Sequence, residues 1–144
     1  MNTTLFRAGL ASFAAAALLI AAPAFAEMQT YKATLTSAAE VPPNASKGTG
    51  TLASTYDTAT KKLTWTVTFT GLSGPATAAH FHGPAAAGAN AGVVVPQKDG
   101  LTSPMKGEAT LTDAQAADLQ GGKWYFNIHT EANKGGEIRG QAMK

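Results

Sequence analysis

Apolar and polar residues alternate with little interruption in the middle of the chain. From Lys62 to Thr70, the residues Leu63, Trp65, Val67 and Phe69 alternate with threonines. A period of two places the apolar side chains on one face of an extended strand and the hydroxyls on the other. The pattern therefore predicts a β-strand with one face buried.

Shorter segments with the same character occur on both sides of this strand. Clusters of Gly, Pro, Asn and Asp separate them, as expected for turns. They span residues 31–36, 48–56, 78–82, 93–95, 105–111, 123–130 and 137–143. About eight strands at this spacing predict an all-β sandwich or barrel.

One short helix is expected between two of these strands. Thr112 and Gln115 have the spacing of a capping box, in which each side chain bonds to the backbone of the other residue. Gly121 and Gly122 then end the helix. The helix is predicted to connect two strands.

The N-terminal residues resemble an export signal. Arg7 precedes the apolar run from Leu10 to Ala22, and Ala24-Phe25-Ala26 has the small residues of a cleavage site. The run is too short for a transmembrane helix. We therefore expect a signal peptide at residues 1–26 and one mature domain at 27–144. This mature protein would be periplasmic or secreted, without a membrane anchor.

Charge and cysteine content exclude several classes of function. The chain has 11 Lys and Arg against 9 Asp and Glu, a net charge of +2, which becomes +1 once Arg7 is removed with the signal. No cluster of basic and aromatic residues predicts nucleic-acid binding. The chain has no cysteine, which excludes disulfides, a lipidated cysteine and thiolate metal ligands.

The histidines are the main candidates for chemistry. His80 and His82 lie in AHFHGP, two positions apart on a predicted strand, so both point to one face with Cα atoms about 6.6 Å apart. His129 lies on the more polar face of the strand KWYFNIHT. If the two strands are neighbours, three imidazoles meet, and imidazole suits copper or zinc. Asn127 and Glu131 are candidates for further support. The alternative is that the histidines are hydrogen-bonded structural residues.

Other polar residues predict structure rather than catalysis. Glu137 and Arg139 lie two apart on the last strand and are expected to form an ion pair, with each other or with another strand. Glu40, in the apolar stretch AAEVPP, is a candidate buried partner for Arg139. Because no GxSxG motif or aligned pair of acids is present, no catalytic residues are assigned.

Four segments together resemble the CHRD domain, the module named after chordin. They are AAEVPP at 38–43, AHFHGPAAAGANAGVVV at 79–95, LTDAQAADLQGGKWYFNIHT at 111–130 and ANKGGEIRGQ at 132–141. The resemblance implies an immunoglobulin-like, Greek-key β-sandwich related to copper/zinc superoxide dismutases. Chordin binds growth factors, but its cysteine-rich binding modules are missing from this chain, so that activity is not expected here.

The more distant resemblance to dismutases concerns individual residues. His80, His82 and His129 occupy positions similar to three copper ligands of those enzymes, and Arg139 is loosely similar to their active-site arginine. The bridging histidine, the zinc ligands and the disulfide are missing, which excludes a complete two-metal dismutase.

Three functions remain open. The first is an exported module that binds copper, or less favourably zinc, through the three histidines. The second is a non-enzymatic interaction module with structural histidines and an unknown protein or polysaccharide partner. The third is a copper-only enzyme similar to superoxide dismutase.

Overall fold

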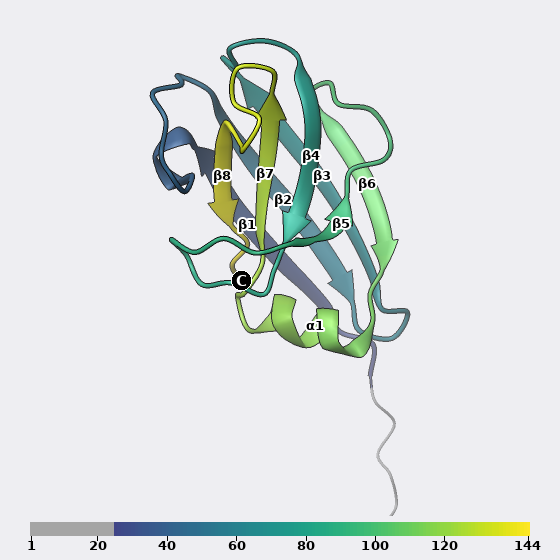
Figure 1. The fold of residues 1–144 in the computed structure, drawn as a ribbon. Helices are drawn as coiled ribbons and strands as arrows, with labels where there is room; N and C mark the ends of the chain where they lie inside the picture. Colours follow the sequence, from purple (N-terminus) through teal and green to yellow (C-terminus); the bar gives the residue numbers. More distant parts are fainter. Residues whose placement is uncertain (1–24) are drawn as a thin grey trace, which may run out of the picture.

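Eight antiparallel strands and one helix form the part of the chain that the structure describes. The computed structural model describes residues 25–144 (Figure 1). The strands are β1 (Met28–Thr36), β2 (Thr49–Asp57), β3 (Lys62–Thr70), β4 (Ala76–His82), β5 (Val93–Pro96), β6 (Met105–Thr110), β7 (Tyr125–Thr130) and β8 (Ile138–Gln141). A 3₁₀ turn, η1 (Ser37–Ala39), follows β1, and the helix α1 (Asp113–Gln120) lies between β6 and β7.

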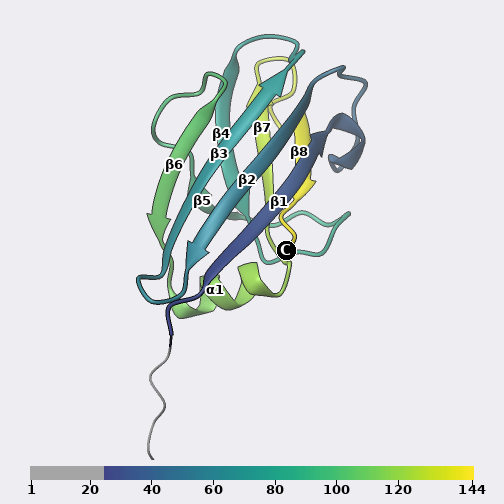
Figure 2. The same cartoon turned by 180° about the vertical axis from the view of Figure 1, so that it is seen from behind.

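The strands form a nearly closed sandwich. Their order is β5-β4-β7-β8-β1-β2-β3-β6, so β5 and β6 are the two edges. Figure 1 shows the layer of β5, β4, β7 and β8 in front, and Figure 2 shows the layer of β1, β2, β3 and β6 from behind. The chain passes between the layers after β3, β5 and β6. The predicted all-β sandwich of about eight strands with one connecting helix is confirmed.

The strands of the back layer pair more regularly with one another than β1 pairs with β8, where the two layers join. Strand β2 pairs along its whole length with β1 and with β3. In contrast, β1 meets β8 at only one ladder position, Thr36 with Arg139, and at an isolated bridge between Lys32 and Met143. The predicted strand 137–143 is therefore shorter, because only Ile138–Gln141 pair continuously with β7.

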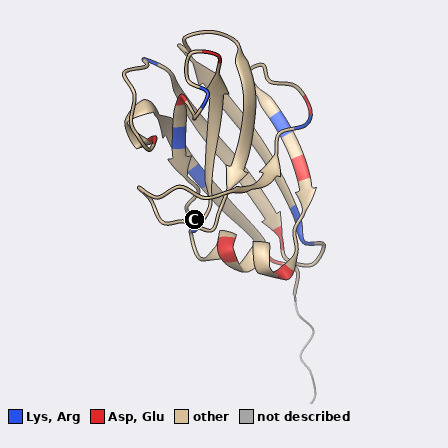
Figure 3. Cartoon of the chain, viewed as in Figure 1, with Lys and Arg blue, Asp and Glu red and all other residues tan. Residues whose placement is uncertain are grey.

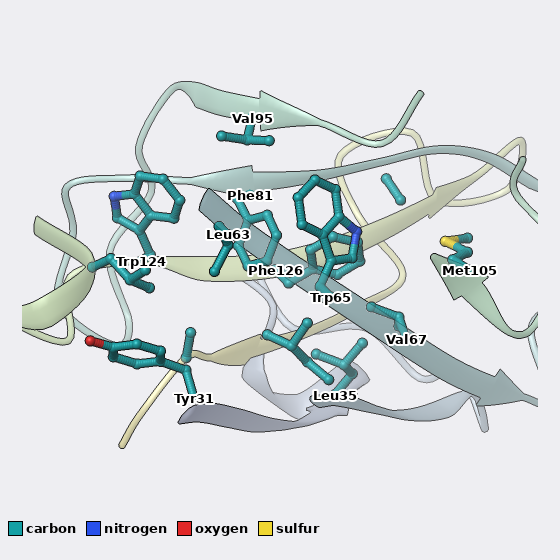
Figure 4. Packing of buried hydrophobic residues seen from close by; sticks show 14 of the residues in the cluster. Tyr31, Leu35, Leu63, Trp65, Val67, Phe81, Val95, Met105, Trp124 and Phe126 are labelled. Carbon is teal, nitrogen blue, oxygen red and sulfur yellow. The ribbon is translucent and has the colours of Figure 1, made fainter. Parts of the chain in front are cut away.

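Aromatic and branched side chains fill the space between the layers (Figure 4). The ring of Phe81 packs edge-to-face against Trp65 at 5.2 Å and against Phe126 at 4.9 Å between centroids. Such edge-to-face pairs are favoured by the quadrupoles of aromatic rings. Because Phe81 points inward on β4, its neighbours His80 and His82 must point to the outer face.

Helix α1 closes one end of the sandwich (Figure 1). The predicted capping box is present: Thr112 Oγ1 accepts a bond from the Gln115 amide, and the Gln115 side chain accepts one from the Thr112 amide. The helix buries Ala116 and Leu119 against the core. A strong local signal in the sequence thus fixes where this connector begins.

Positions of basic and acidic residues are scattered over the strands and loops, and the helix carries acidic residues only (Figure 3). No helix in the described part of the chain combines the length and hydropathy needed to cross a membrane. The predicted signal peptide at residues 1–26 lies outside the described residues except for its last two.

Candidate metal site

Strands β4 and β7 bring the three histidines together. The two strands are antiparallel neighbours, and in their register His80 lies opposite Asn127 and Ala78 opposite His129. Since alternate residues share a face, all three imidazoles project from the outer face of the front layer. The predicted meeting of the three histidines is thus what the fold produces.

The three rings are close enough for hydrogen bonds and for a shared ligand. His80 Nδ1 lies 3.2 Å from His129 Nε2. The ring of His80 lies 5.4 Å from that of His82 and 5.0 Å from that of His129, between centroids. Each ring offers one nitrogen, and these three nitrogens all lie within 4.8 Å of one another.

Backbone carbonyls orient two of the imidazoles. His82 Nδ1 lies 2.9 Å from the Ala91 carbonyl oxygen, and His129 Nδ1 lies 2.8 Å from that of Lys134. A carbonyl oxygen can only accept, so each Nδ1 carries the hydrogen. In a neutral ring, Nε2 then carries the lone pair, and this second hydrogen bond is the usual way in which proteins orient a histidine ligand.

The two carbonyls come from loops that fold back over the outer face. Ala91 belongs to the loop GPAAAGANAG, which the sequence predicts to be a surface connection between two strands. The Tyr125 hydroxyl lies 3.1 Å from the Ala91 amide nitrogen and 3.2 Å from its carbonyl oxygen, which ties this loop to β7. The loop is therefore part of the site, because it sets the orientation of His82.

A stack of three side chains borders the site. The His82 and Tyr125 rings are parallel, with an interplanar angle of 3° and centroids 4.8 Å apart. The Arg139 guanidinium lies over the Tyr125 ring, with Cζ 3.4 Å from its centroid. Arg139 also donates to Asn90 Oδ1 at 2.8 Å and to the Ala89 carbonyl. Arg139 thus supports the loop and Tyr125, and its charge also lowers the pKa of His82.

Burial favours the neutral form of His80 and His82. Desolvation lowers the pKa of His80, and the neighbouring His129 and His82 lower it further. Desolvation also lowers the pKa of His82, although its hydrogen bonds act in the opposite direction. Neutral imidazole is the form that binds metal ions.

Of the two predicted supporting residues Asn127 and Glu131, one lies in the histidine cluster and the other lies outside it. Asn127 lies between two of the histidines, with Oδ1 2.9 Å from His82 Nε2 and 3.0 Å from His129 Nε2. Glu131 is exposed and forms an ion pair with Lys134 at 2.9 Å. The structure therefore brings Asn127 into the cluster, and Glu131 stays outside it.

Glu40 lies on the far side of Asn127, and its part in the site is not evident from the sequence. Its side chain is 4% exposed, and within the described residues Oε1 has no hydrogen-bond partner. Burial raises the pKa of Glu40 to about 7, with the Arg139 charge and the Asn127 amide pulling it partly back. Only the unusual position of an acid in AAEVPP hints at this environment.

The prediction that Arg139 forms an ion pair with Glu137 or Glu40 is wrong. Within the described part of the chain, neither Glu137 nor Glu40 forms an ion pair with it. Hydroxyl and amide donors surround the Glu137 carboxylate instead. The Arg139 guanidinium is occupied by the loop carbonyl, Asn90 and the Tyr125 ring.

The donor set fits a first-row metal ion that accepts imidazole. Nitrogen ligands lie 2.0–2.1 Å from zinc, so two ligands of one ion are at most about 4.2 Å apart. Of the nitrogens in the cluster, His80 Nδ1 and His129 Nε2 already satisfy this at 3.2 Å. A pair at the 4.8 Å limit has to approach by a few tenths of an ångström.

Comparison with known families gives one match. The family model described as CHRD domain matches residues 31–142, nearly the whole described chain. No curated protein and no solved structure matches the chain significantly. The resemblance to the CHRD domain is confirmed, and the distant resemblance to copper/zinc dismutases stays a prediction.

Proposed function

The chain belongs to the CHRD domain family, and we propose that it is an exported module that binds one copper ion through His80, His82 and His129. Zinc is the weaker alternative, because divalent copper binds nitrogen ligands more tightly than zinc does. Bound copper would supply a redox-active or Lewis-acidic centre. The protein would supply three neutral imidazoles and the loops that orient them.

One observation carries this proposal. His82 and His129 each direct Nδ1 at a backbone carbonyl, so the lone pairs of both Nε2 atoms point into the cluster. Outer hydrogen bonds that fix the tautomer are a regular feature of histidine metal sites.

The location of the protein fits such a site. CHRD domains are generally extracellular, and we propose export to the periplasm or beyond the cell. A site of three imidazoles has no thiolate that an oxidising compartment would convert to a disulfide. The absence of cysteine from this chain is therefore compatible with stable copper binding outside the cytoplasm.

Calorimetric titration tests the proposal. Cu²⁺ is titrated into the purified protein, free of any histidine tag, and into a variant in which all three histidines are alanine. We expect one tight site in the protein and its loss in the variant. Copper bound weakly at the N-terminus or at carboxylates remains in both. Equal binding by the two proteins would contradict the proposal.

One observation favours a second candidate, a non-enzymatic interaction module. Each histidine already has hydrogen-bond partners within the described residues, as structural histidines do. In that case copper leaves the melting temperature unchanged, whereas an ion that binds only the folded state raises it. The melting temperature with and without one equivalent of Cu²⁺ distinguishes the two functions.

A further inference from the structure

The Asn127 side chain occupies an unusual position between two imidazoles. Its terminal amide atom lies 2.9 Å from His82 Nε2 and 3.0 Å from His129 Nε2. Asn127 is 3% exposed, so water does not replace these contacts. One amide thus contacts both of the nitrogens that the proposed metal site requires.

The hydrogens at this contact follow from the backbone. Since the Ala91 and Lys134 carbonyls fix a hydrogen on each Nδ1, a neutral ring has only a lone pair at Nε2. A side-chain carbonyl oxygen beside two lone pairs would have no hydrogen bond. The NH₂ end of the same amide has two hydrogens, one for each nitrogen.

Asn127 Oδ1 could accept hydrogen bonds from both Nε2 atoms only if the His82 and His129 rings were both positively charged. Each such ring would place an N–H, rather than a lone pair, at the Nε2 that faces the amide. Two adjacent imidazolium rings in a largely buried cluster would also repel each other. Rotating the amide by 180° exchanges its nitrogen and oxygen in place and gives each Nε2 lone pair an N–H donor without a charge. At His129 Nε2 this donor shares the lone pair with the His80 Nδ1 contact at 3.2 Å.

We propose that Asn127 is a positioning residue that holds the metal-free site: its Nδ2 donates to Nε2 of both His82 and His129, and it withdraws when a metal ion binds. The first half concerns the metal-free protein alone. The second half rests on the proposed function. Until a metal ion binds, the Asn127 amide keeps the Nε2 lone pairs of His82 and His129 directed inward and the two rings slightly apart.

The separation of the ligand nitrogens agrees with this role. The three nitrogens spread over as much as 4.8 Å, whereas two ligands of one ion are at most about 4.2 Å apart. An amide atom that accepts or donates at about 3 Å to both rings sets a wider spacing than a metal ion does. Binding therefore requires the amide to release the rings.

The surroundings of Asn127 accommodate the rotated amide. Its other end faces Gly136 and the Glu40 carboxyl group, and a Cβ atom on Gly136 would collide with both side chains. Glu40 Oε1 has no hydrogen-bond partner within the described residues. The rotated amide directs its carbonyl oxygen at this carboxyl group, which donates a hydrogen bond when protonated. Rotation removes the amide donor that lowers the pKa of Glu40, which favours this protonated form further.

NMR of the metal-free protein tests the first half directly. Long-range ¹H–¹⁵N spectra at pH 6.5, below the pKa of about 7 at Glu40, identify the tautomer of each histidine, and couplings across N–H···N bonds identify the donor. We expect hydrogen on Nδ1 of His82 and His129, with couplings from Asn127 Nδ2 to both Nε2 nitrogens. Hydrogen on either Nε2, or no coupling from Asn127, would overturn the proposal.

Metal affinity of Asn127→Ala tests the second half. Removing two competing hydrogen bonds, each worth about 1 kcal/mol, should tighten Cu²⁺ or Zn²⁺ binding roughly thirtyfold. Gln29→Ala is the matched control, since Gln29 is a buried amide that bonds to Tyr31 and Gln120. This control should leave the affinity unchanged.

The outcomes separate the two proposals. Weaker or equal binding by Asn127→Ala would overturn the release of the amide. Binding by Asn127→Ala but not by the unaltered protein would support it. If neither protein binds metal, the proposed function fails, and the NMR result alone decides whether Asn127 holds the two rings.

Discussion

Two buried glutamates in this protein have opposite electrostatic environments. Glu137 is fully buried, and its pKa is lowered to about 2. Glu40 is 4% exposed, and its pKa is raised to about 7. Desolvation raises both values, so the difference comes from the donors around each carboxyl group.

Five hydrogen bonds surround Glu137. Ser46 Oγ and the Ser73 amide donate to Oε1 at 2.5 and 2.7 Å. Ser73 Oγ, Thr130 Oγ1 and Asn133 Nδ2 donate to Oε2 at 2.6, 2.5 and 3.1 Å. These donors outweigh desolvation, so the carboxylate holds three loops together as an ionised structural centre.

Glu40 lacks such a set of donors. Arg139 is near enough to lower its pKa partly, but it forms no ion pair with it. Oε1 has no partner within the described residues. The ionised form of Glu137 therefore stabilises the fold. The ionised form of Glu40, beside the candidate metal site, destabilises it. Such costly groups are typical of functional sites.

Glu137→Gln should have the largest effect on stability. The NH₂ of glutamine would face donors that have no acceptor left, and charge-assisted hydrogen bonds would be lost, so we expect a loss of about 3 kcal/mol or more. Urea denaturation at pH 7 measures it. Glu108→Gln, which removes an exposed ion pair with Lys62, is the control and should change stability by less than about 0.5 kcal/mol. A loss below about 1 kcal/mol for Glu137→Gln would contradict the structural role.

Acid should weaken the protein through Glu137. Its pKa in the folded state lies below the ordinary 4.5, so its contribution is complete above pH 4.5 and is lost as the pH falls toward 2. The free energy of unfolding of the unaltered protein minus that of Glu137→Gln should shrink over this range. A constant difference would contradict the assignment.

Arg139→Lys should have the next largest effect. Lysine cannot lie flat on Tyr125 while it also donates to Asn90 and the Ala89 carbonyl, so we expect a loss of about 2 kcal/mol. Thermal or urea unfolding measures it, and Lys106→Arg, an exposed exchange on β6, is the control. If Arg139→Lys were as stable as the unaltered protein, the positive charge alone, and not the shape of the guanidinium, would account for the role of Arg139.

Glu40→Gln should raise stability at high pH. The pKa of Glu40 in the folded state lies above 4.5, so the protein loses stability as the pH rises from 4.5 through about 7. Glutamine avoids this loss, and we expect a gain of about 1–2 kcal/mol at pH 8 and almost none at pH 4. Urea denaturation at both pH values checks this. A gain that is equal at both would contradict a titrating Glu40.

Glu131→Gln should have the smallest effect. Glu131 is exposed and pairs only with Lys134, so a stability change below about 0.5 kcal/mol is expected. Copper titration should also be unchanged, since the carboxylate does not face the histidines. A weaker copper affinity of the Glu131→Gln variant would indicate that Glu131 is a copper ligand after all.

The sequence predicts the strands and the helix well because their signals are local. The alternation in β3 and the capping box at Thr112 each depend on residues a few positions apart. The meeting of His80, His82 and His129 also follows once β4 and β7 are neighbours. Whether β4 and β7 are adjacent depends on how the chain crosses between the layers, and local sequence patterns do not specify this.

The partners of the buried charges were not predictable for the same reason. Glu40 and Asn127 are far apart in the sequence, and so are Glu137 and its donors Ser46 and Ser73. The sequence pairs Glu137 with Arg139 by proximity alone, and this is wrong. Likewise, nothing in the composition of the loop GPAAAGANAG indicates that its Ala91 carbonyl orients His82.

Electron paramagnetic resonance of the copper-loaded protein tests the central claim most directly. With one equivalent of Cu²⁺, we expect nitrogen couplings from imidazole ligands that are lost or altered in each of the variants His80→Ala, His82→Ala and His129→Ala. Gln29→Ala, which leaves all three imidazoles and both orienting loops in place, should give the unaltered spectrum. A spectrum without imidazole nitrogen, or one that none of the three histidine substitutions changes, would contradict a copper site at these residues.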